Sequence, residues 1–199
     1  MPIVGLLSLH RRAVLASVEA VSRIRADDLA RPTPCAEWAV ADLLAHMTAQ
    51  HHGFAAAAEG HGGDPAVWTV QPLGEDPVAD YAAAAERVLS AFARDGVLER
   101  TFTLAEFRPV STFPATSAIG FHLIDYVVHG WDVARSLGLP YELHPALADT
   151  ALRIALEVPD GKNRLAPGSA FQPSLAVAAD AGPLAQILSA LGRCPTWPR

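Results

Sequence analysis

The sequence predicts an all-α protein, a four-helix bundle with short extra helices and a proline-rich C-terminal tail. Hydrophobic residues make up 51% of the 199 residues and charged residues 18%, a balance typical of a compact globular chain. Four long stretches carry apolar residues at the three- and four-residue spacing of an amphipathic helix, and moderate loops join them. We therefore expect residues 1–199 to form a single helical-bundle domain.

Two of these helices are predicted before residue 61. The first covers residues 5–26, and its apolar face consists of Leu6, Leu9, Ala13, Ala16, Ala20 and Ile24. Pro32 and Pro34 then interrupt the pattern, because proline cannot donate the hydrogen bond that a helix interior needs. The second helix runs from Glu37 to Gly60, where glycine is a typical stop.

The rest of the chain is predicted to alternate loops with helices. Residues 60–77 are rich in Gly and Pro and read as a loop, followed by a third helix over 77–95. Residues 100–110 alternate like a strand, which predicts a short hairpin or an extended link. The fourth long helix is predicted from Thr112 or Pro114 to Ser136, closed by Gly138 and Pro140. Shorter helices are expected at Pro145–Val158 and at 183–191, the latter within the tail.

Charge and cysteine content argue against several classes of function. The formal net charge is −6 and there is no run of Lys or Arg, so nucleic-acid binding is not expected. The longest stretches without charged residues, 109–124 and 165–179, are shorter than the roughly 18–20 apolar residues of a spanning helix, so no membrane partner is expected. Cys35 and Cys194 are far apart, which suits a cytoplasmic protein in a reducing compartment; a disulfide between them is the less favoured alternative.

The segment "HLIDYVVHGWDVA", residues 122–134, carries the candidate chemistry. On a helix, His122, Asp125, His129 and Asp132 share one face, flanked by apolar residues. Asp125 and His129 are four residues apart, so both can reach one ion. A third ligand must come from another element, and His46 is the best candidate because it lies among core residues of the second helix. Two imidazoles and a carboxylate leave coordination positions open, which is typical of a catalytic metal site.

Simpler interpretations compete with a metal site. A histidine in an apolar helix is more often a hydrogen-bonded core residue than a ligand, although a buried carboxylate is costly unless it is paired or bound to metal. His122 is either a fourth ligand or lines the pocket one turn further along. Asp132 either orients an imidazole or pairs with Arg135 on the surface.

Other histidines and Cys35 are weaker candidates. His51 and His52 lie about 140° and 240° around the helix from His46, which points them away from the same site. His61 lies in the glycine-rich loop and is expected to be exposed. Cys35 precedes a predicted helix N-terminus, where a thiolate is favoured, but the simpler expectation is a small buried residue beside Trp38.

Three segments resemble one known superfamily. "TPCAEWAVADLLAHMTAQHHGFAAAAEG", "DYVVHGWDVARSLG" and "FQPSLAVAADAGPLAQILSALGRCPTW" are similar, in this order, to a metal-binding branch of the DinB-like, mycothiol-dependent maleylpyruvate isomerase N-terminal superfamily. The resemblance implies a four-helix bundle that holds a divalent metal, usually zinc, through His46, Asp125 and His129. The isomerase has Glu where this chain has Asp125, one methylene shorter, and its separate C-terminal domain is not evident in this sequence.

The resemblance and the motif together lead to a functional hypothesis. We expect a metal-dependent transferase or isomerase that acts on a small molecule with a low-molecular-weight, mycothiol-like thiol as cosubstrate. Zn2+ is the expected metal, with Ni2+ and Fe2+ as alternatives, and His122 and Asp132 are expected to transfer protons or to orient the ligands. The alternative functions are a non-catalytic metal-binding bundle and a dimerisation module; homodimers are common among helix bundles.

Overall fold

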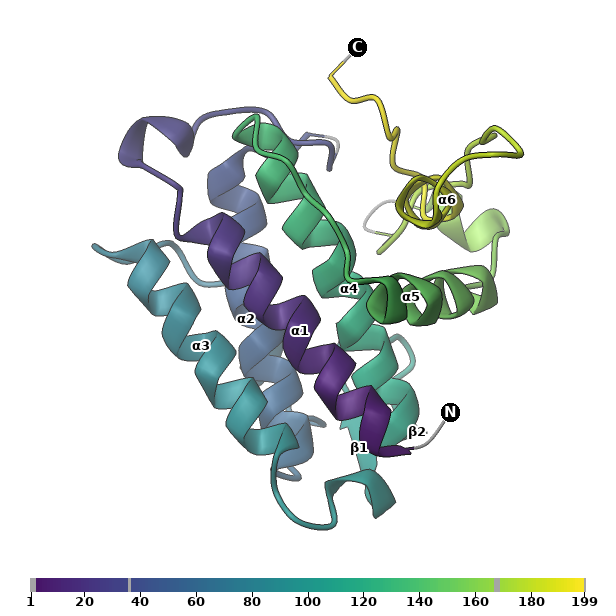
Figure 1. Cartoon of the computed structure of the whole chain (residues 1–199). Helices are drawn as coiled ribbons and strands as arrows, with labels where there is room; N and C mark the ends of the chain where they lie inside the picture. The colour runs from purple at the N-terminus through teal and green to yellow at the C-terminus, as the bar shows by residue number, and fades with distance from the viewer. Residues whose placement is uncertain (1–2, 36, 167–168, 199) are drawn as a thin grey trace.

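Four long helices lie side by side and form the bundle in the computed structural model, which describes residues 3–35, 37–166 and 169–198 (Figure 1). They are α1 (Ile3–Val21), α2 (Val40–Ala58), α3 (Pro77–Phe92) and α4 (Ala115–Ser136). Helix α1 packs against α4, and α2 packs against α3 and α4. The all-α four-helix architecture predicted from the sequence is therefore confirmed.

Shorter elements surround the bundle. Helices α5 (Pro145–Glu157) and α6 (Pro183–Ala190) pack against each other beside α4 (Figure 1). Strands β1 (Thr101–Leu104) and β2 (Ser111–Pro114) form an antiparallel hairpin in which Phe102 pairs with Phe113. Of the two forms expected for residues 100–110, the hairpin is the one that occurs. Single turns of 3-10 helix lie at Ala26–Asp28, Pro65–Trp68, Val97–Glu99 and Lys162–Leu165.

Helices α2 and α4 end at the predicted glycines. Gly60 and Gly138 have φ of 92° and 71°, a left-handed conformation that costs glycine nothing because it has no Cβ. The following amides reach back into the last turn, with His61 N donating to Ala56 O at 2.8 Å and Leu139 N donating to Ala134 O at 2.8 Å. These bonds close the C-terminal ends of α2, which carries His46, and of α4, which carries His129.

Helix α1 ends earlier than predicted, and helix α2 begins later than predicted. α1 ends at Val21, because the next turn is fixed by Asp28, whose carboxylate accepts from Arg25 N at 2.9 Å. α2 begins at Val40 rather than at Glu37, which has φ of 68° and cannot continue a right-handed helix. Residues 32–35 and 37–39 instead lie in a loop that brings Cys35 and Trp38 to one end of α2.

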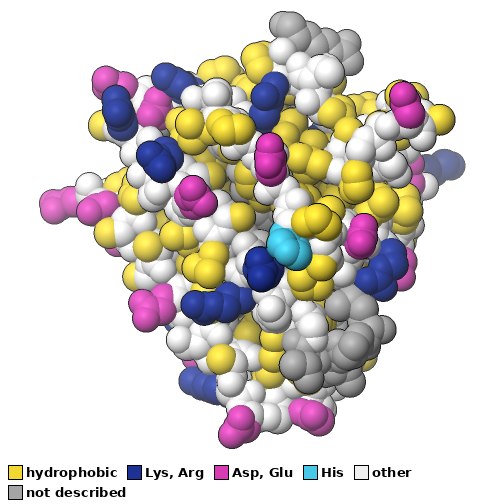
Figure 2. Space-filling view, in the orientation of Figure 1, with side chains coloured by type: hydrophobic (Ala, Val, Ile, Leu, Met, Phe, Trp, Pro, Cys, Tyr) yellow, Lys and Arg dark blue, Asp and Glu magenta, His cyan; other side chains and the backbone are white. Residues whose placement is uncertain are grey.

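Most of the core is apolar, but several polar and charged side chains are also buried, among them Asp132, His129 and Arg193. In its apolar part, fully buried Tyr81, Leu43, Met47 and Val88 lie between α2 and α3, for example. Figure 2 shows acidic and basic side chains interspersed over one face, with little histidine visible there. Among the described residues, no helix combines the length and the hydrophobicity needed to cross a bilayer.

A tight contact between α2 and the following loop allows a test of this packing. A Cβ on Gly53 would lie 2.2 Å from the Trp68 ring, whereas a Cβ on Gly120 would meet only Ile154 Cδ1, at 3.7 Å. We expect Gly53→Ala to lower the free energy of unfolding by about 1–3 kcal/mol through overpacking. Gly120→Ala is the matched control and should raise it by about 0.5–1 kcal/mol, because alanine favours the helix. Urea unfolding measures both values, and equal effects would contradict the predicted contact.

Candidate metal centre

Helices α2 and α4 bring three of the predicted side chains together. One ligand atom each from His46, Asp125 and His129 lies within 4.8 Å of the other two. The rings of His46 and His129 meet edge to face, with centroids 5.3 Å apart. Asp125 reaches the two imidazoles although its side chain is one methylene shorter than that of Glu. The i, i+4 spacing on α4 is what places Asp125 and His129 on one face.

The imidazole of His129 lies between two carboxylates. Its Nε2 is 3.3 Å from Asp125 Oδ1, and its Nδ1 is 3.0 Å from Asp132 Oδ2. Burial by itself lowers the pKa of His129, but the charge and the hydrogen bond of Asp125, followed by those of Asp132, raise it to about 9. His129 keeps the pKa of the Asp125 carboxyl below its usual value in spite of burial. Asp132 thus fixes the ring with Nε2 directed at Asp125.

Asp132 is completely buried and has a second cationic partner. Arg193, which follows α6 in the C-terminal tail, places its Nε 3.2 Å from Asp132 Oδ1 and 3.3 Å from Oδ2. The alternative expectation, a surface pair between Asp132 and Arg135, is wrong. Arg135 donates instead to the Trp197 carbonyl at 2.6 Å, while the buried Asp132 carboxylate contacts His129 and Arg193.

One side of the centre is closed by the loop before α2. The Trp38 ring lies 4.8 Å from that of His46, and burial, with a smaller contribution from His129, lowers the pKa of His46 to about 4. His46 is therefore neutral at pH 7 and has a lone pair free for a metal. His46 and Asp125 retain partial exposure, while His129 is 3% exposed, so the centre opens to solvent from the side of His46 and Asp125.

The turn of the hairpin reaches the same side. Glu106 lies in this turn and hydrogen-bonds the Gln50 side chain of α2. Glu106 is an exposed residue, but its neighbours and the negative charge of Asp125 raise the pKa of its carboxyl. A carboxyl whose pKa is raised toward neutrality is suited to act as a general acid or base.

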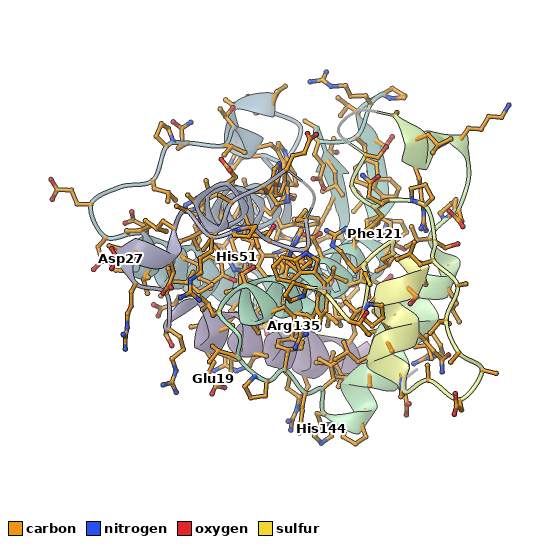
Figure 3. The ribbon with its side chains drawn as sticks, turned by 90° about the horizontal axis from the view of Figure 1, so that it is seen from above. Glu19, Asp27, His51, Phe121, Arg135 and His144 are labelled. Atoms are coloured by element: carbon orange, nitrogen blue, oxygen red, sulfur yellow. The ribbon has the colours of Figure 1, made fainter. Side chains whose placement is uncertain are left out.

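His122 is not brought to the metal ligands. Its Nδ1 is 2.8 Å from His10 Nε2, and its Nε2 is 3.2 Å from His51 Nδ1. The three rings are buried among aromatic residues, with Tyr126 stacked on His51 at 4.0 Å and on His122 at 4.2 Å. Figure 3 shows His51 inside the bundle, whereas Glu19, Asp27 and His144 lie toward its outside. These contacts favour a packing role for His122; a role in proton transfer stays a prediction.

The structure also answers the expectations about the weaker candidates. His61 is exposed, as predicted, and His52 lies beside Arg87 Nη1 at 3.4 Å. Cys35 and Cys194 are not joined by a disulfide. Of the two interpretations of Cys35, its surroundings favour the simpler one over a thiolate, because burial raises the pKa of this thiol to about 11 and Arg193 only partly offsets the burial. α2 begins five positions further on, so its N-terminal dipole is too distant to act.

The donor set suits zinc. Neutral imidazole and carboxylate are ordinary zinc ligands, and three protein ligands leave at least one position open in a tetrahedral site. The Asp132 carboxylate accepts a hydrogen bond from Nδ1 of His129 and leaves Nε2 for the metal. A carboxylate in this position is common behind histidines that bind zinc. The residues present therefore fit a divalent metal of this kind.

Comparisons with known proteins place the chain in a family. The sequence model of the "Mycothiol maleylpyruvate isomerase N-terminal domain" matches residues 10–134, which include His46, Asp125 and His129. The chain belongs to this family.

Relatives and solved structures agree with the assignment. Two uncharacterized proteins, from two strains of Mycobacterium tuberculosis, are each 31% identical over 195 residues, which cover 94% of this chain and 97% of theirs. Crystal structures of the mycothiol-dependent maleylpyruvate isomerase and of its histidine-to-alanine variant share the fold. Their TM-scores are 0.62 and 0.63 at 14% and 13% identity, and the matches cover 96% of this chain and 89% of those chains.

Sequence reasoning missed three residues at the centre. Arg193 lies 61 residues after Asp132, and no helical periodicity links the two positions. Glu106 and Gln50 meet only because the hairpin folds back over α2. Cys35 was considered, but not its contact with Arg193, in which Nη2 lies 3.2 Å from Sγ. The one available signal was the isolated arginine in an otherwise apolar C-terminal segment, "LAQILSALGRC".

The buried histidines predict how stability depends on pH. Burial, reinforced for His51 and His122 by the neighbouring imidazoles, lowers the pKa of each ring, to about 3 for His10. The unfolded chain therefore protonates these three histidines first, so the stability that they contribute is complete above about pH 6.5 and is lost as the pH falls below it.

Replacing one member tests this dependence. Between pH 7 and pH 5, wild type should lose about 2 kcal/mol more unfolding free energy than His10→Leu, which has one buried imidazole fewer to charge. Urea unfolding at the two pH values gives the difference. His61→Leu, at an exposed position, should behave like wild type. An equal loss in wild type and His10→Leu would show that the three histidines do not resist protonation.

Proposed function

We propose that this protein is a divalent-metal-dependent transferase or isomerase. It acts on a small molecule and uses a low-molecular-weight thiol of the mycothiol kind as cosubstrate. The observation that carries the proposal is the grouping of His46, Asp125 and His129, three ligands that leave coordination positions open on a partly exposed side. Membership of the mycothiol maleylpyruvate isomerase N-terminal domain family supports the thiol and the reaction type. Zinc is the metal that suits these ligands best.

Each residue around the proposed metal site has a separate role. His46, Asp125 and His129 would hold a zinc ion, which would supply the Lewis acidity that lowers the pKa of a thiol. Asp132 holds the Nδ1 proton of His129, so that Nε2 faces the ion. Trp38 keeps water from one side of His46. Glu106 gives or takes a proton at the open side, where its carboxyl lies near Asp125.

Turnover with and without thiol tests the reaction. Zinc-loaded protein is incubated with electrophilic small molecules in the presence of mycothiol, of bacillithiol or of neither, and thiol consumption and product are followed. We expect turnover that requires both the metal and a thiol. Turnover that is indifferent to thiol, or its complete absence together with no thiol-induced change in the spectrum of the cobalt-substituted protein, would contradict the proposal.

Substitution of His129 tests the metal site. Zinc at one hundred times its Kd should raise the unfolding free energy of wild type by about 2.7 kcal/mol and leave His129→Ala unchanged, because the variant lacks a ligand and binds no ion. His51→Ala is the matched control: it removes an equally buried imidazole from the helix that carries His46. This variant should lose stability yet keep the full response to zinc. A full zinc response in His129→Ala would rule out His129 as a ligand.

Substitution of Glu106 tests its role in proton transfer. Glu106→Gln keeps the shape of the side chain but cannot exchange a proton, so kcat should fall by about 10²-fold while zinc content stays the same. The pH profile of the residual rate should lack the ionisation that the raised pKa of Glu106 predicts for wild type. An unchanged kcat would show that the hairpin turn is not part of the reaction.

A further inference from the structure

His129 belongs to two sets of potential metal ligands. The first set adds His46 and Asp125, and the second adds Cys35 and Asp132; within each set the ligand atoms lie within 4.8 Å of one another. Asp125 lies against Nε2 of the ring and Asp132 against Nδ1. Because these nitrogens point in different directions, the two sets define two separate positions for a cation on either side of one imidazole.

The second position already holds a positive charge. The guanidinium of Arg193 contacts both oxygens of Asp132 through Nε, at 3.2 and 3.3 Å, and contacts Cys35 Sγ through Nη2, at 3.2 Å. Arg193 is 3% exposed and Asp132 is fully buried. The guanidinium therefore touches two of the three side chains of the second set and lies in the buried space that they share.

A metal ion and an arginine are alternatives at such a place. Buried Asp132 needs a positive partner, because an uncompensated buried carboxylate is strongly destabilising. Thiolate, imidazole and carboxylate together would satisfy zinc equally well. Unlike a metal ion, an arginine side chain keeps its charge, cannot be exchanged for another ion and cannot coordinate an external thiol. Burial raises the pKa of the Cys35 thiol to about 11 although the guanidinium lowers it, so the thiol keeps its proton while Arg193 is in place.

We propose that the centre contains two cation positions that share His129, and that Arg193 fills the second one and thereby excludes a metal ion from it. The two cation positions do not depend on the proposed function, and only their consequence for thiol binding rests on it. A single metal at His46, Asp125 and His129 keeps open positions, and Cys35 does not compete with an external thiol for them. The C-terminal tail thus determines how many metals the centre accepts.

Removal of the guanidinium should open the second position. Cobalt is added to wild type, Arg193→Ala, Arg193→Lys and the double variant Arg193→Ala with Cys35→Ser, all checked for folding by circular dichroism. Arg193→Ala should gain a thiolate-to-cobalt charge-transfer absorption, and its metal content should rise from about one to about two ions per chain. Binding of the second ion would release two protons to solvent, one from the Cys35 thiol and one from Nδ1 of His129, which would then bridge the two ions as an imidazolate. The lysine variant, which keeps a positive charge, and the double variant should lack this absorption.

A folded Arg193→Ala protein with the metal content and spectrum of wild type would overturn the proposal. The single variant Cys35→Ser tests it separately, even if Arg193→Ala does not fold. It should leave the metal content and the cobalt spectrum unchanged, and loss of metal or of a thiolate absorption would show that Cys35 is already a ligand. Failure of the proposed function is distinguishable, because absence of thiol-dependent turnover would leave the absorption in Arg193→Ala unaffected.

Discussion

The alternation of charge along Asp125, His129, Asp132 and Arg193 is the constraint on which the centre depends. Two carboxylates and two cationic groups follow one another at 3.0 to 3.3 Å in a largely buried space. A buried ion is tolerated only when its partner is in place. Each group in the series therefore offsets the free-energy cost of burying its neighbour. Helix α4 supplies three of the four and the C-terminal tail supplies the last. The position of the tail against α4 is therefore part of the chemistry of the site.

The spacing of the histidines separates them into two environments. His122 and His129 are seven residues apart, about two turns, and share one face of α4. His46 and His51 are five residues apart, about 140° around α2, so they cannot serve one site. Each helix consequently contributes one imidazole to the carboxylate-rich centre and one to the aromatic core with His10. The same residue type is a charged or ligating group in the first environment and a neutral packing group in the second.

The helices and the pairing of Asp125 with His129 on one face could be predicted because both follow from local spacing. Gly60 and Gly138 terminate helices through their own conformation, and the i, i+4 pair on α4 needs nothing beyond helix geometry. The partner of Asp132 could not be predicted in this way, since Arg193 reaches it only after α5 and α6 have packed. The position of His122 depended on His10, a residue from a helix whose phase relative to α4 is set by tertiary packing. The start of α2 was missed because Glu37 adopts a left-handed conformation that single-residue preferences do not favour.

The long separation along the chain between Asp132 and Arg193 has a consequence for the order of folding. The bundle helices α1 to α4 are complete by Ser136, but Asp132 gains its counter-charge only when a segment 61 residues further along has closed the loop. Until then the place that Arg193 fills is open, and Cys35, Asp132 and His129 can offer a thiol, a carboxylate and an imidazole to an ion. If the two cations compete as proposed, an ion that binds before the tail docks would occupy the place of the guanidinium.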